Sequence, residues 1–356
     1  MCLRVACLQV NPVHGKVAEN RARAREMLER RQKELQGVHL LVLPEMAFTG
    51  YHWRSKEHIS EVVETSKGPT SQWCKEVAKM LRCVVCCGLP LSYRRRLVNS
   101  MLVVGPKGTF VTRVDKVHLY ESDKTWAEPG KSFKSLERVE GLPIAPVGFG
   151  ICMDINPLDF KNPPEMFEFA NFHREKGSRL LIFTSAWCKN HPDDSPEAFR
   201  AMSDQDLSRE TLNTWLRRLG PLHGREVYFV CANRVGREPL ELLGRNTELQ
   251  NQFCGTSCVI SLRDQQVLEQ LSASEEGLLI ADIPIPELED VLPLWHLFVV
   301  LAAARAPGIG SRKFRGAKAS WLKGCAAMAE LGTCKVAGEP ESLILVGLTL
   351  SAPVLT

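Results

Sequence analysis

The chain has 356 residues, of which 44% are hydrophobic and 24% charged, and its formal net charge is +4. This length can bury a large core in one or two domains, and the composition is that of an ordinary globular protein. Because the basic residues are scattered along the chain and form no stripe, the sequence argues against a nucleic-acid-binding protein.

Cysteine usage indicates a reducing compartment. The thirteen cysteines show no paired Cys-x-x-Cys spacing of the zinc type. A strand-like run begins within two residues of Met1, so no secretory segment fits there. We therefore expect a protein of the cytoplasm, with the nucleus as an alternative. Several cysteines lie inside apolar runs, where a thiol packs as a small buried hydrophobe: Cys83, Cys86, Cys87, Cys231 and Cys258.

Short β-rich runs alternate with helix-like stretches through most of the chain. This alternation predicts a layered α/β fold, and the Pro-Lys-Gly turn at 106–108 predicts a hairpin, so the sheets should be mixed. The expected strands are 3–10, 39–43, 83–89, 99–105, 109–114, 147–152, 179–184, 226–232, 256–261 and 277–283. The expected helices are 16–36, 71–81, 164–176 and 204–219.

The alternating pattern ends near Pro286. The segment Leu292–Ala304 is apolar but spans only about thirteen residues, which is too short for a membrane-spanning helix. The basic stretch Gly308–Lys323 and the apolar segment Leu343–Leu350 carry no motif that we can interpret. We therefore expect a main domain over 1–288 and an atypical tail over 289–356. The tail is either poorly ordered or an additional helix that packs on the domain or on a partner.

Three short blocks each place one reactive side chain beside an apolar strand. They are LVLPEMAFTGY (41–51), TRVDKVHL (112–119) and VGFGICMDINP (147–157). In that order they supply a carboxylate, an ammonium and a thiol. A base, a cation and a nucleophile together are sufficient to cleave an amide through a covalent acyl-enzyme.

Each of the three side chains fits one role in that chemistry. Cys152 lies where a strand turns into a helix, which we expect to be an exposed position that favours the thiolate. Glu45 follows a buried strand among apolar neighbours, so its pKa should be raised into the range of a general base. Lys116 ends an edge strand, and its cation can stabilise an oxyanion. Taken singly, each residue also has a purely structural interpretation: Cys152 as a buried thiol, Glu45 as a surface glutamate and Lys116 as an edge-strand lysine.

The order and flanks of the three blocks resemble the nitrilase superfamily of carbon–nitrogen hydrolases. The resemblance continues through TSAW (184–187), CANRVG (231–236) and GLLIADI (277–283). It implies a four-layer αββα sandwich and a triad in which Glu45 is the base, Lys116 the oxyanion stabiliser and Cys152 the nucleophile. This chemistry requires no metal and no organic cofactor.

Many members of that superfamily carry a further glutamate between the lysine and a Pro-Gly pair. The corresponding segment here is YESDKTWAEPG (120–130). Residue type favours Glu121, our first choice, whereas the spacing favours Asp123, and Glu128 lies nearby. The sequence leaves this role open.

Within the superfamily, CMDINP followed by Glu168–Ala170 and TSAW looks most like protein N-terminal asparagine and glutamine amidases. This resemblance implies that the chain converts an N-terminal Asn or Gln of a protein or peptide to Asp or Glu, releases ammonia and feeds the N-degron pathway. Because such a substrate has a free α-amino group, we expect an anion in the pocket, supplied by Asp154, Glu121 or Asp123. Asp154 can equally cap the following helical turn.

Three aromatic residues lie beside the blocks and can form the wall of a small pocket, although aromatic residues also occupy core positions. They are Phe48, Trp126 and Trp187.

Two other functions remain open from the sequence. A small-metabolite amidase or carbamoylase of the ω-amidase kind would need a cation for a substrate carboxylate, and no motif singles one out. A non-catalytic scaffold on the same fold has no need for an intact triad, although the unusual tail keeps that reading open. Family members usually form dimers through helices near the nucleophile, so a homodimer is one expectation and a monomer the other.

Overall fold

The computed structural model describes residues 2–200 and 202–285. The predicted tail over 289–356 lies outside the described residues, as does the predicted domain boundary at 288. Among the helices of the described part, none is long and apolar enough to cross a membrane.

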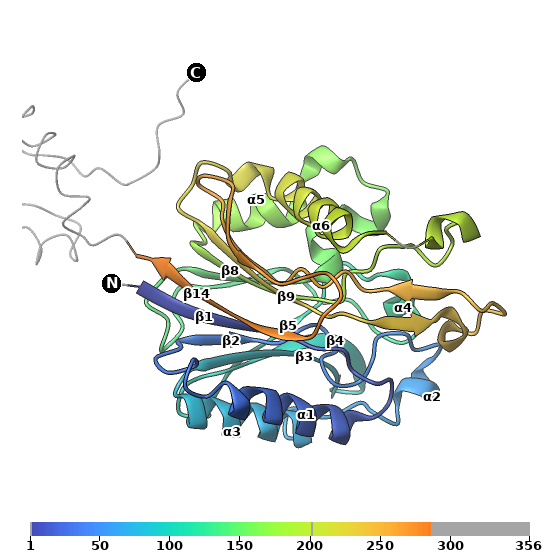
Figure 1. The fold of residues 1–356 in the computed structure, drawn as a ribbon, viewed down its shortest axis with the longest axis horizontal. Helices are drawn as coiled ribbons and strands as arrows, with labels where there is room; N and C mark the ends of the chain where they lie inside the picture. The colour runs from blue at the N-terminus through green and yellow to red at the C-terminus, as the bar shows by residue number, and fades with distance from the viewer. Residues whose placement is uncertain (1, 201, 286–356) are drawn as a thin grey trace, which may run out of the picture. The chain divides into compact units, whose positions relative to one another are not determined.

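Two six-stranded sheets form the centre of the described domain (Figure 1). The first sheet has the strand order β14 (Gly277–Pro284), β1 (Cys2–Gln9), β2 (Leu40–Val42), β3 (Val84–Tyr93), β4 (Arg96–Val104) and β5 (Phe110–Asp115). The second has the order β13 (Gln266–Gln270), β12 (Cys258–Ser261), β9 (Tyr228–Asn233), β8 (Leu180–Ser185), β7 (Val147–Ile151) and β6 (Lys134–Leu136). A small separate sheet pairs β10 (Arg237–Pro239) with β11 (Gln250–Gln252).

Both large sheets are mixed, as predicted. The central strands β1, β2 and β3 are parallel, as are β7, β8 and β9, whereas the outer pairs are antiparallel. The predicted hairpin is also present, because β4 pairs with β5 in antiparallel register.

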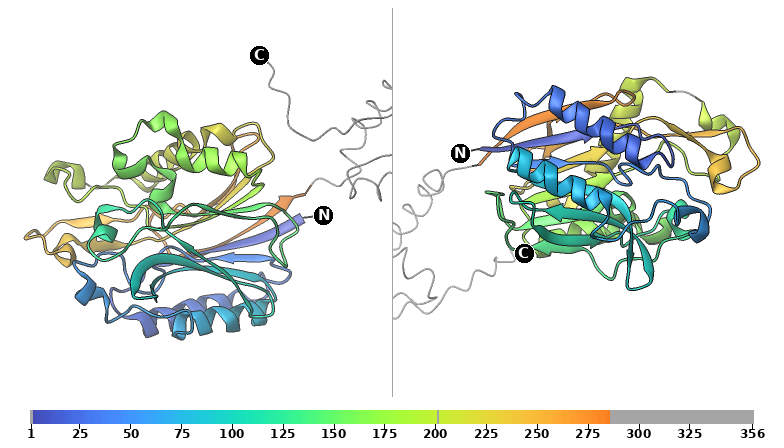
Figure 2. Two further views of the ribbon diagram at one scale, coloured as in Figure 1. Left: turned by 180° about the vertical axis from the view of Figure 1, so that it is seen from behind. Right: turned by 90° about the horizontal axis from the view of Figure 1, so that it is seen from below.

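Helices cover the outer face of each sheet. The first sheet carries α1 (Val17–Arg30) and α3 (Pro69–Leu81), which lie side by side in the view from below (Figure 2). The second carries α5 (Glu168–Glu175) and α6 (Asp204–Arg218). The resulting layers are helix, sheet, sheet and helix, so the predicted αββα sandwich is confirmed. The shorter helices are α2 (Lys56–Ile59) and α4 (Glu121–Lys124), with 3₁₀ turns at Cys152–Ile155, Leu158–Phe160, Pro164–Met166, Pro196–Phe199, Gly220–Leu222 and Leu240–Leu243.

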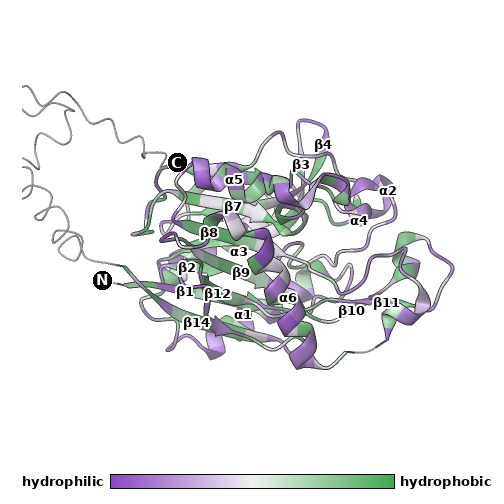
Figure 3. Ribbon diagram, turned by 90° about the horizontal axis from the view of Figure 1, so that it is seen from above, coloured by the Kyte–Doolittle hydropathy of each residue, from purple (hydrophilic) through white to green (hydrophobic). Residues whose placement is uncertain are grey.

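The two-residue period of the strands produces these layers. In β1, Val5 and Cys7 face the core between the two sheets, whereas Ala6 and Leu8 face α1 and α3. Because both faces of the central strands are buried, these strands are apolar almost throughout. Figure 3 shows the consequence: the inner strands are largely hydrophobic, whereas α6 presents hydrophilic residues.

Two of the predicted helices differ from the observed ones. The helix expected over 16–36 ends at Arg30, after which the backbone continues in turns. The helix expected over 164–176 is divided, because Phe167 adopts a left-handed backbone (φ 43°) between a 3₁₀ turn and α5. The short or polar strands β6, β10, β11 and β13 were not predicted.

Candidate active site

The three reactive side chains of the sequence blocks meet at one end of the sandwich. Glu45 follows β2, Lys116 follows β5, and Cys152 follows β7, so two come from the first sheet and one from the second. All three side chains are buried: Glu45 and Lys116 are 0% exposed and Cys152 is 6% exposed. The structure therefore brings the predicted triad together.

The segment that carries Glu45 packs tightly against β3. A Cβ atom at Gly88 would lie 2.5 Å from the Cα atom of Glu45 and 2.5 Å from the carbonyl oxygen of Pro44. The carbonyl of Gly88 also accepts a hydrogen bond from the N–H of Ala47 at 2.9 Å. Glycine is thus required at this position, because any side chain would push Glu45 out of place.

Lys116 forms the centre of a buried charged cluster. Its Nζ lies 2.6 Å from Oε1 of Glu45, 2.6 Å from Oδ2 of Asp123 and 3.2 Å from the hydroxyl of Tyr51. Asn99 binds both carboxylates, because its Nδ2 donates to Glu45 at 2.7 Å and to Asp123 at 2.9 Å. Asn99 was not predicted, although it is a polar residue inside the apolar run of β4.

Asp123 therefore occupies the position of the second carboxylate, and our first choice, Glu121, was wrong. Glu121 is exposed and pairs with Lys124 at 2.7 Å, while Glu128 pairs with Arg96 at 2.6 Å. In the short helix α4, Asp123 faces inward and Glu121 faces outward. Spacing along the sequence therefore identified the second carboxylate better than residue type did.

The charges in this cluster shift one another's titration. Burial raises the pKa of Glu45, and the nearby Lys116 only partly offsets this effect. For Lys116 itself, burial lowers the pKa, but the carboxylates of Asp123 and Glu45 outweigh burial and hold the pKa above its usual value. Lys116 is thus a permanent cation, and Glu45 is a stronger base than an exposed glutamate, as the sequence predicted.

Cys152 lies at a sharp turn where β7 passes into the 3₁₀ helix Cys152–Ile155. Its backbone is left-handed, with φ 43°, a conformation that is costly for a residue with a side chain and that recurs where a nucleophile is presented. The expected exposed thiolate is not found. Burial, followed by the charge of Glu45, raises the pKa of the thiol well above its usual value. The raised pKa disfavours the thiolate, so the thiol needs a neighbouring base to take its proton before it can attack.

Asp154 organises the backbone of the site. Its Oδ1 accepts hydrogen bonds from the N–H groups of Val117 (2.8 Å) and His118 (2.9 Å), and its Oδ2 accepts one from Ile151 (2.9 Å). It ties the segment after Lys116 to the segment before Cys152. The expectation that Asp154 receives a substrate amino group is not supported, because both its oxygens are taken up by the backbone.

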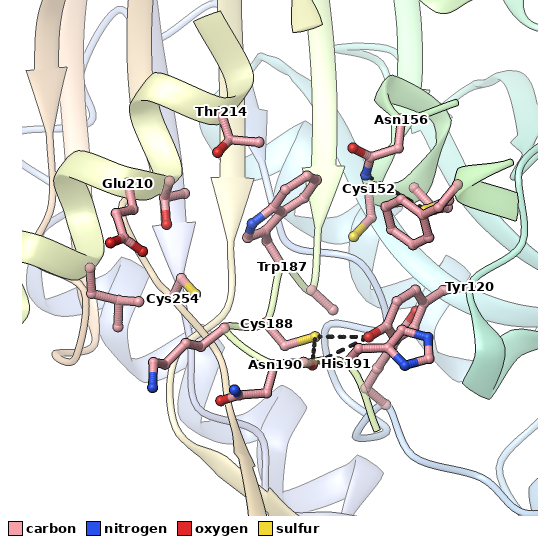
Figure 4. Close-up of a pocket in the computed structure, with 17 residues that line it drawn as sticks. Tyr120, Cys152, Asn156, Trp187, Cys188, Asn190, His191, Glu210, Thr214 and Cys254 are labelled. Carbon is pink, nitrogen blue, oxygen red and sulfur yellow. Dashed lines mark hydrogen bonds between the residues drawn. The ribbon is translucent and has the colours of Figure 1, made fainter. Parts of the chain in front are cut away.

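A cavity of about 480 Å³ opens beside Cys152 (Figure 4). Trp187 lies in its wall, as predicted, whereas Trp126 and Phe48 are fully or nearly buried in hydrophobic core clusters. The side chains that line the cavity include Tyr51, Tyr120, Cys152, Asn156, Phe160, Trp187, Cys188, Asn190, Glu210, Thr211, Thr214 and Cys254.

The carboxylates expected in the pocket do not line this cavity. Neither Asp154, Glu121 nor Asp123 belongs to its wall; among the described residues, the carboxylate that does is Glu210 on α6. In Figure 4, the ring of Trp187 lies between Glu210 and Cys152. Glu210 lies in an ordinary charged stretch of the surface helix α6, so no sequence pattern singles it out.

Comparison with known proteins agrees with this geometry. The model of the carbon–nitrogen hydrolase family matches residues 4–291. The chain belongs to this family. The protein N-terminal amidase of Schizosaccharomyces pombe is 32% identical over 304 residues, which cover 79% of this chain and 99% of the relative. The protein N-terminal amidase of Saccharomyces cerevisiae is 27% identical over 211 residues, which cover 52% of this chain and 45% of the relative.

A solved structure shows the same fold. The crystal structure of an N-terminal amidase with an Asn-Glu-Ala peptide has a TM-score of 0.67 and 18% sequence identity, and the match covers 79% of this chain and 97% of that chain.

In this carbon–nitrogen hydrolase, a second buried ion pair contacts the loop that carries Tyr51. Glu238 is paired with Arg234 and accepts hydrogen bonds from the backbone N–H groups of Tyr51 (3.1 and 3.0 Å) and His52 (2.9 Å). The guanidinium of Arg234 stacks on Phe253 at 3.9 Å. The pair therefore fixes the loop that carries Tyr51, a role that the CANRVG block did not reveal.

This pair should make the stability of the protein depend on pH. Burial alone would raise the pKa of Glu238, but the charge of Arg234 and the backbone hydrogen bonds hold it at about 2. A lowered carboxyl pKa stabilises the fold at pH values above the pKa of the unfolded chain, which is about 4.5. This stabilisation of about 3 kcal/mol is lost as the pH falls toward 2.

In urea unfolding, we expect Glu238→Gln to be less stable than wild type at neutral pH and the difference to shrink toward pH 2. The exposed Glu140→Gln serves as control, and a difference for Glu238→Gln that does not change with pH would contradict this account.

Proposed function

We propose that this carbon–nitrogen hydrolase is a protein N-terminal amidase, which converts an N-terminal Asn or Gln of a protein or peptide to Asp or Glu with release of ammonia. The observation that carries the proposal is a thiol, Cys152, that lies beside a buried Glu45–Lys116 pair and faces a cavity of about 480 Å³. That volume lies in the range of small-ligand sites and exceeds what a single carboxamide needs. The relative in Schizosaccharomyces pombe, matched over nearly its whole length, supports the choice of substrate.

The residues suggest a two-step reaction. Glu45 takes the proton of Cys152, and the thiolate attacks the carbon of the side-chain carboxamide. The oxyanion of the tetrahedral intermediate faces the positive charge of Lys116 and a backbone N–H beside Cys152. As the C–N bond breaks, Glu45 returns its proton to the leaving nitrogen, and ammonia departs. Glu45 then activates a water molecule, which hydrolyses the thioester and regenerates the thiol.

The hydrogen bonds of Glu45 fit its role as the base. Its Oε1 is occupied by Lys116 and Asn99, whereas its Oε2 accepts one hydrogen bond, from the N–H of Ala186 at 2.8 Å. Oε2 therefore keeps a free lone pair for the proton of the thiol. The strand register places Ala186 just beyond the pair Ile151–Thr184, on the same side of the sheet end as Cys152.

The pH dependence of the reaction should report Glu45. Because burial raises its pKa, the carboxylate becomes protonated at a higher pH than an exposed glutamate, and a protonated Glu45 cannot accept the proton of the thiol. We expect kcat/KM to fall on the acid side with an apparent pKa above the usual value for glutamate. The pH profile of kcat/KM measures this directly; an acid limb at the ordinary glutamate pKa would contradict the assignment.

The cavity gives less support to a small-metabolite amidase. Such an enzyme would need a free cation for a substrate carboxylate. Lys189 lines the cavity, but its ammonium already donates to the backbone carbonyls of Ala198 (2.7 Å) and Arg200. The ammonium of Lys189 is therefore not available to bind a substrate carboxylate.

Ammonia release tests the proposed function. We would compare peptides beginning with Asn or Gln with their N-acetylated forms and with the monoamide of a small dicarboxylic acid. We expect turnover of the free-amine peptides and little turnover of the others. Preference for the monoamide over the free-amine peptides would replace the proposal with a metabolite amidase.

A further inference from the structure

Tyr51 lies between the charged cluster and the cavity. Its side chain is 1% exposed and belongs to the cavity wall, whereas Glu45, Lys116 and Asp123 lie behind that wall. Tyr51 thus connects the two, because it lines the cavity together with Cys152 while its hydroxyl contacts the ammonium of Lys116 at 3.2 Å.

All three ammonium protons of Lys116 are engaged in hydrogen bonds. An ammonium has three N–H donors. One donates to Glu45 and one to Asp123, each at 2.6 Å, and the third donates to the Tyr51 hydroxyl at 3.2 Å. With this arrangement Lys116 has no further proton to offer to an oxyanion.

The proton of the Tyr51 hydroxyl is weakly held. Its acceptor is Oδ2 of Asp123 at 3.3 Å, well beyond the usual O–H···O distance of about 2.7–2.8 Å. The same oxygen already accepts from Lys116 at 2.6 Å and from the N–H of Tyr120 at 2.9 Å. The hydroxyl can therefore turn its proton toward a better acceptor at little cost.

We propose that the Tyr51 hydroxyl is the side-chain donor to the carbonyl oxygen of the substrate and to the oxyanion of the tetrahedral intermediate, and that Lys116 acts through it. This inference rests on the proposed amide hydrolysis. The hydroxyl accepts a hydrogen bond from the ammonium and donates its own to the substrate oxygen, so the positive charge strengthens the donor. No proton leaves Tyr51, because burial and the neighbouring carboxylates raise its pKa well above the usual value.

The position of Tyr51 is fixed before substrate arrives. Its backbone N–H is held by Glu238, and its ring packs edge-on against Phe253 at 6.0 Å between ring centroids. A donor that is already oriented costs no reorganisation in the transition state, which is the requirement for an effective oxyanion hole.

The test is the substitution Tyr51→Phe, which removes only the hydroxyl and leaves Lys116 one hydrogen-bond length back from the substrate. We expect kcat to fall about 10²- to 10³-fold, the usual effect of losing one oxyanion donor, with KM changed much less. The matched control is Tyr228→Phe, which removes another tyrosine hydroxyl, one that donates to the carbonyl of Pro284 at 3.1 Å outside the cavity. Its kcat should equal that of wild type.

A second readout separates catalysis from structure. Alkylation of Cys152 by iodoacetamide passes through no oxyanion intermediate. Tyr51→Phe should therefore leave the rate of alkylation and its pH profile unchanged. The inference is overturned if Tyr51→Phe keeps kcat within about threefold of wild type, or if kcat and alkylation fall together. The kcat ratio can be measured on any amide that the wild type hydrolyses, so activity on the monoamide alone would refute the proposed substrate and still decide the role of Tyr51.

Discussion

Replacing Cys152 with alanine is expected to abolish ammonia release, with a fall in kcat of about 10⁴-fold or more, because removal of the nucleophile ends covalent catalysis. The fold should be retained, because alanine keeps the Cβ atom at this turn and removes only the sulfur atom. The measurement is steady-state ammonia release from an N-terminal Asn peptide, with urea unfolding to confirm the fold. Cys2→Ala, at an exposed thiol outside the cavity, should match wild type.

A second thiol sharpens this prediction. Cys188 also lines the cavity, but it bonds to the carbonyl of Asn190 at 3.4 Å, and burial raises its pKa to about 11. If Cys152→Ala kept its activity and Cys188→Ala lost it, the nucleophile would have to be Cys188, and the assignment of the triad would be wrong.

Replacing Lys116 with methionine is expected to destabilise the protein and to inactivate it. Glu45 and Asp123 would be left as two buried carboxylates without their shared cation, and breaking a buried ion pair in this way costs about 3–5 kcal/mol. The pKa of Glu45 would rise further without the opposing charge of Lys116, so a larger fraction of the carboxyl would be protonated and unable to act as base. Urea unfolding and ammonia release measure the two effects separately.

The matched control for this substitution is Lys107→Met. Lys107 also pairs with a glutamate at 2.6 Å, but both partners are exposed, at 74% and 64%. Exposed pairs contribute little to stability, so Lys107→Met should leave the urea midpoint and the activity unchanged. Equal effects of the two substitutions would show that burial of the Lys116 cluster does not have the energetic role assigned to it.

The sequence was informative where local pattern decides the structure. The central strands are buried on both faces, so their apolar runs could be recognised, and Glu45 and Cys152 follow two of them, whereas Lys116 follows the edge strand β5. The distribution of roles between Glu121 and Asp123 could not be predicted, because it depends on which way one turn of α4 faces. Asn99 and Glu238 were missed since they act on distant parts of the chain, Asn99 on Glu45 and Glu238 on the loop of Tyr51. Arg234 was missed together with its partner Glu238.

The environment of Cys152 was predicted incorrectly for a similar reason. A thiol at a strand end is often exposed, but here Cys152 is buried, with Glu45, Lys116, Ser185 and Ala186 near its thiol. Its raised pKa is a property of that enclosure, which a single sequence does not contain. The consequence is functional, because a buried thiol makes the base Glu45 necessary.

Trapping of the acyl-enzyme would identify the nucleophile and the substrate in one measurement. The wild type would be mixed with a peptide that begins with Gln, quenched in acid and analysed by intact-mass and fragmentation mass spectrometry, beside the N-acetylated peptide. We expect an adduct equal to the peptide minus ammonia, attached at Cys152, from the free-amine peptide alone. An adduct on another cysteine, or equal labelling by the acetylated peptide, would rule out Cys152 as the nucleophile of an N-terminal amidase.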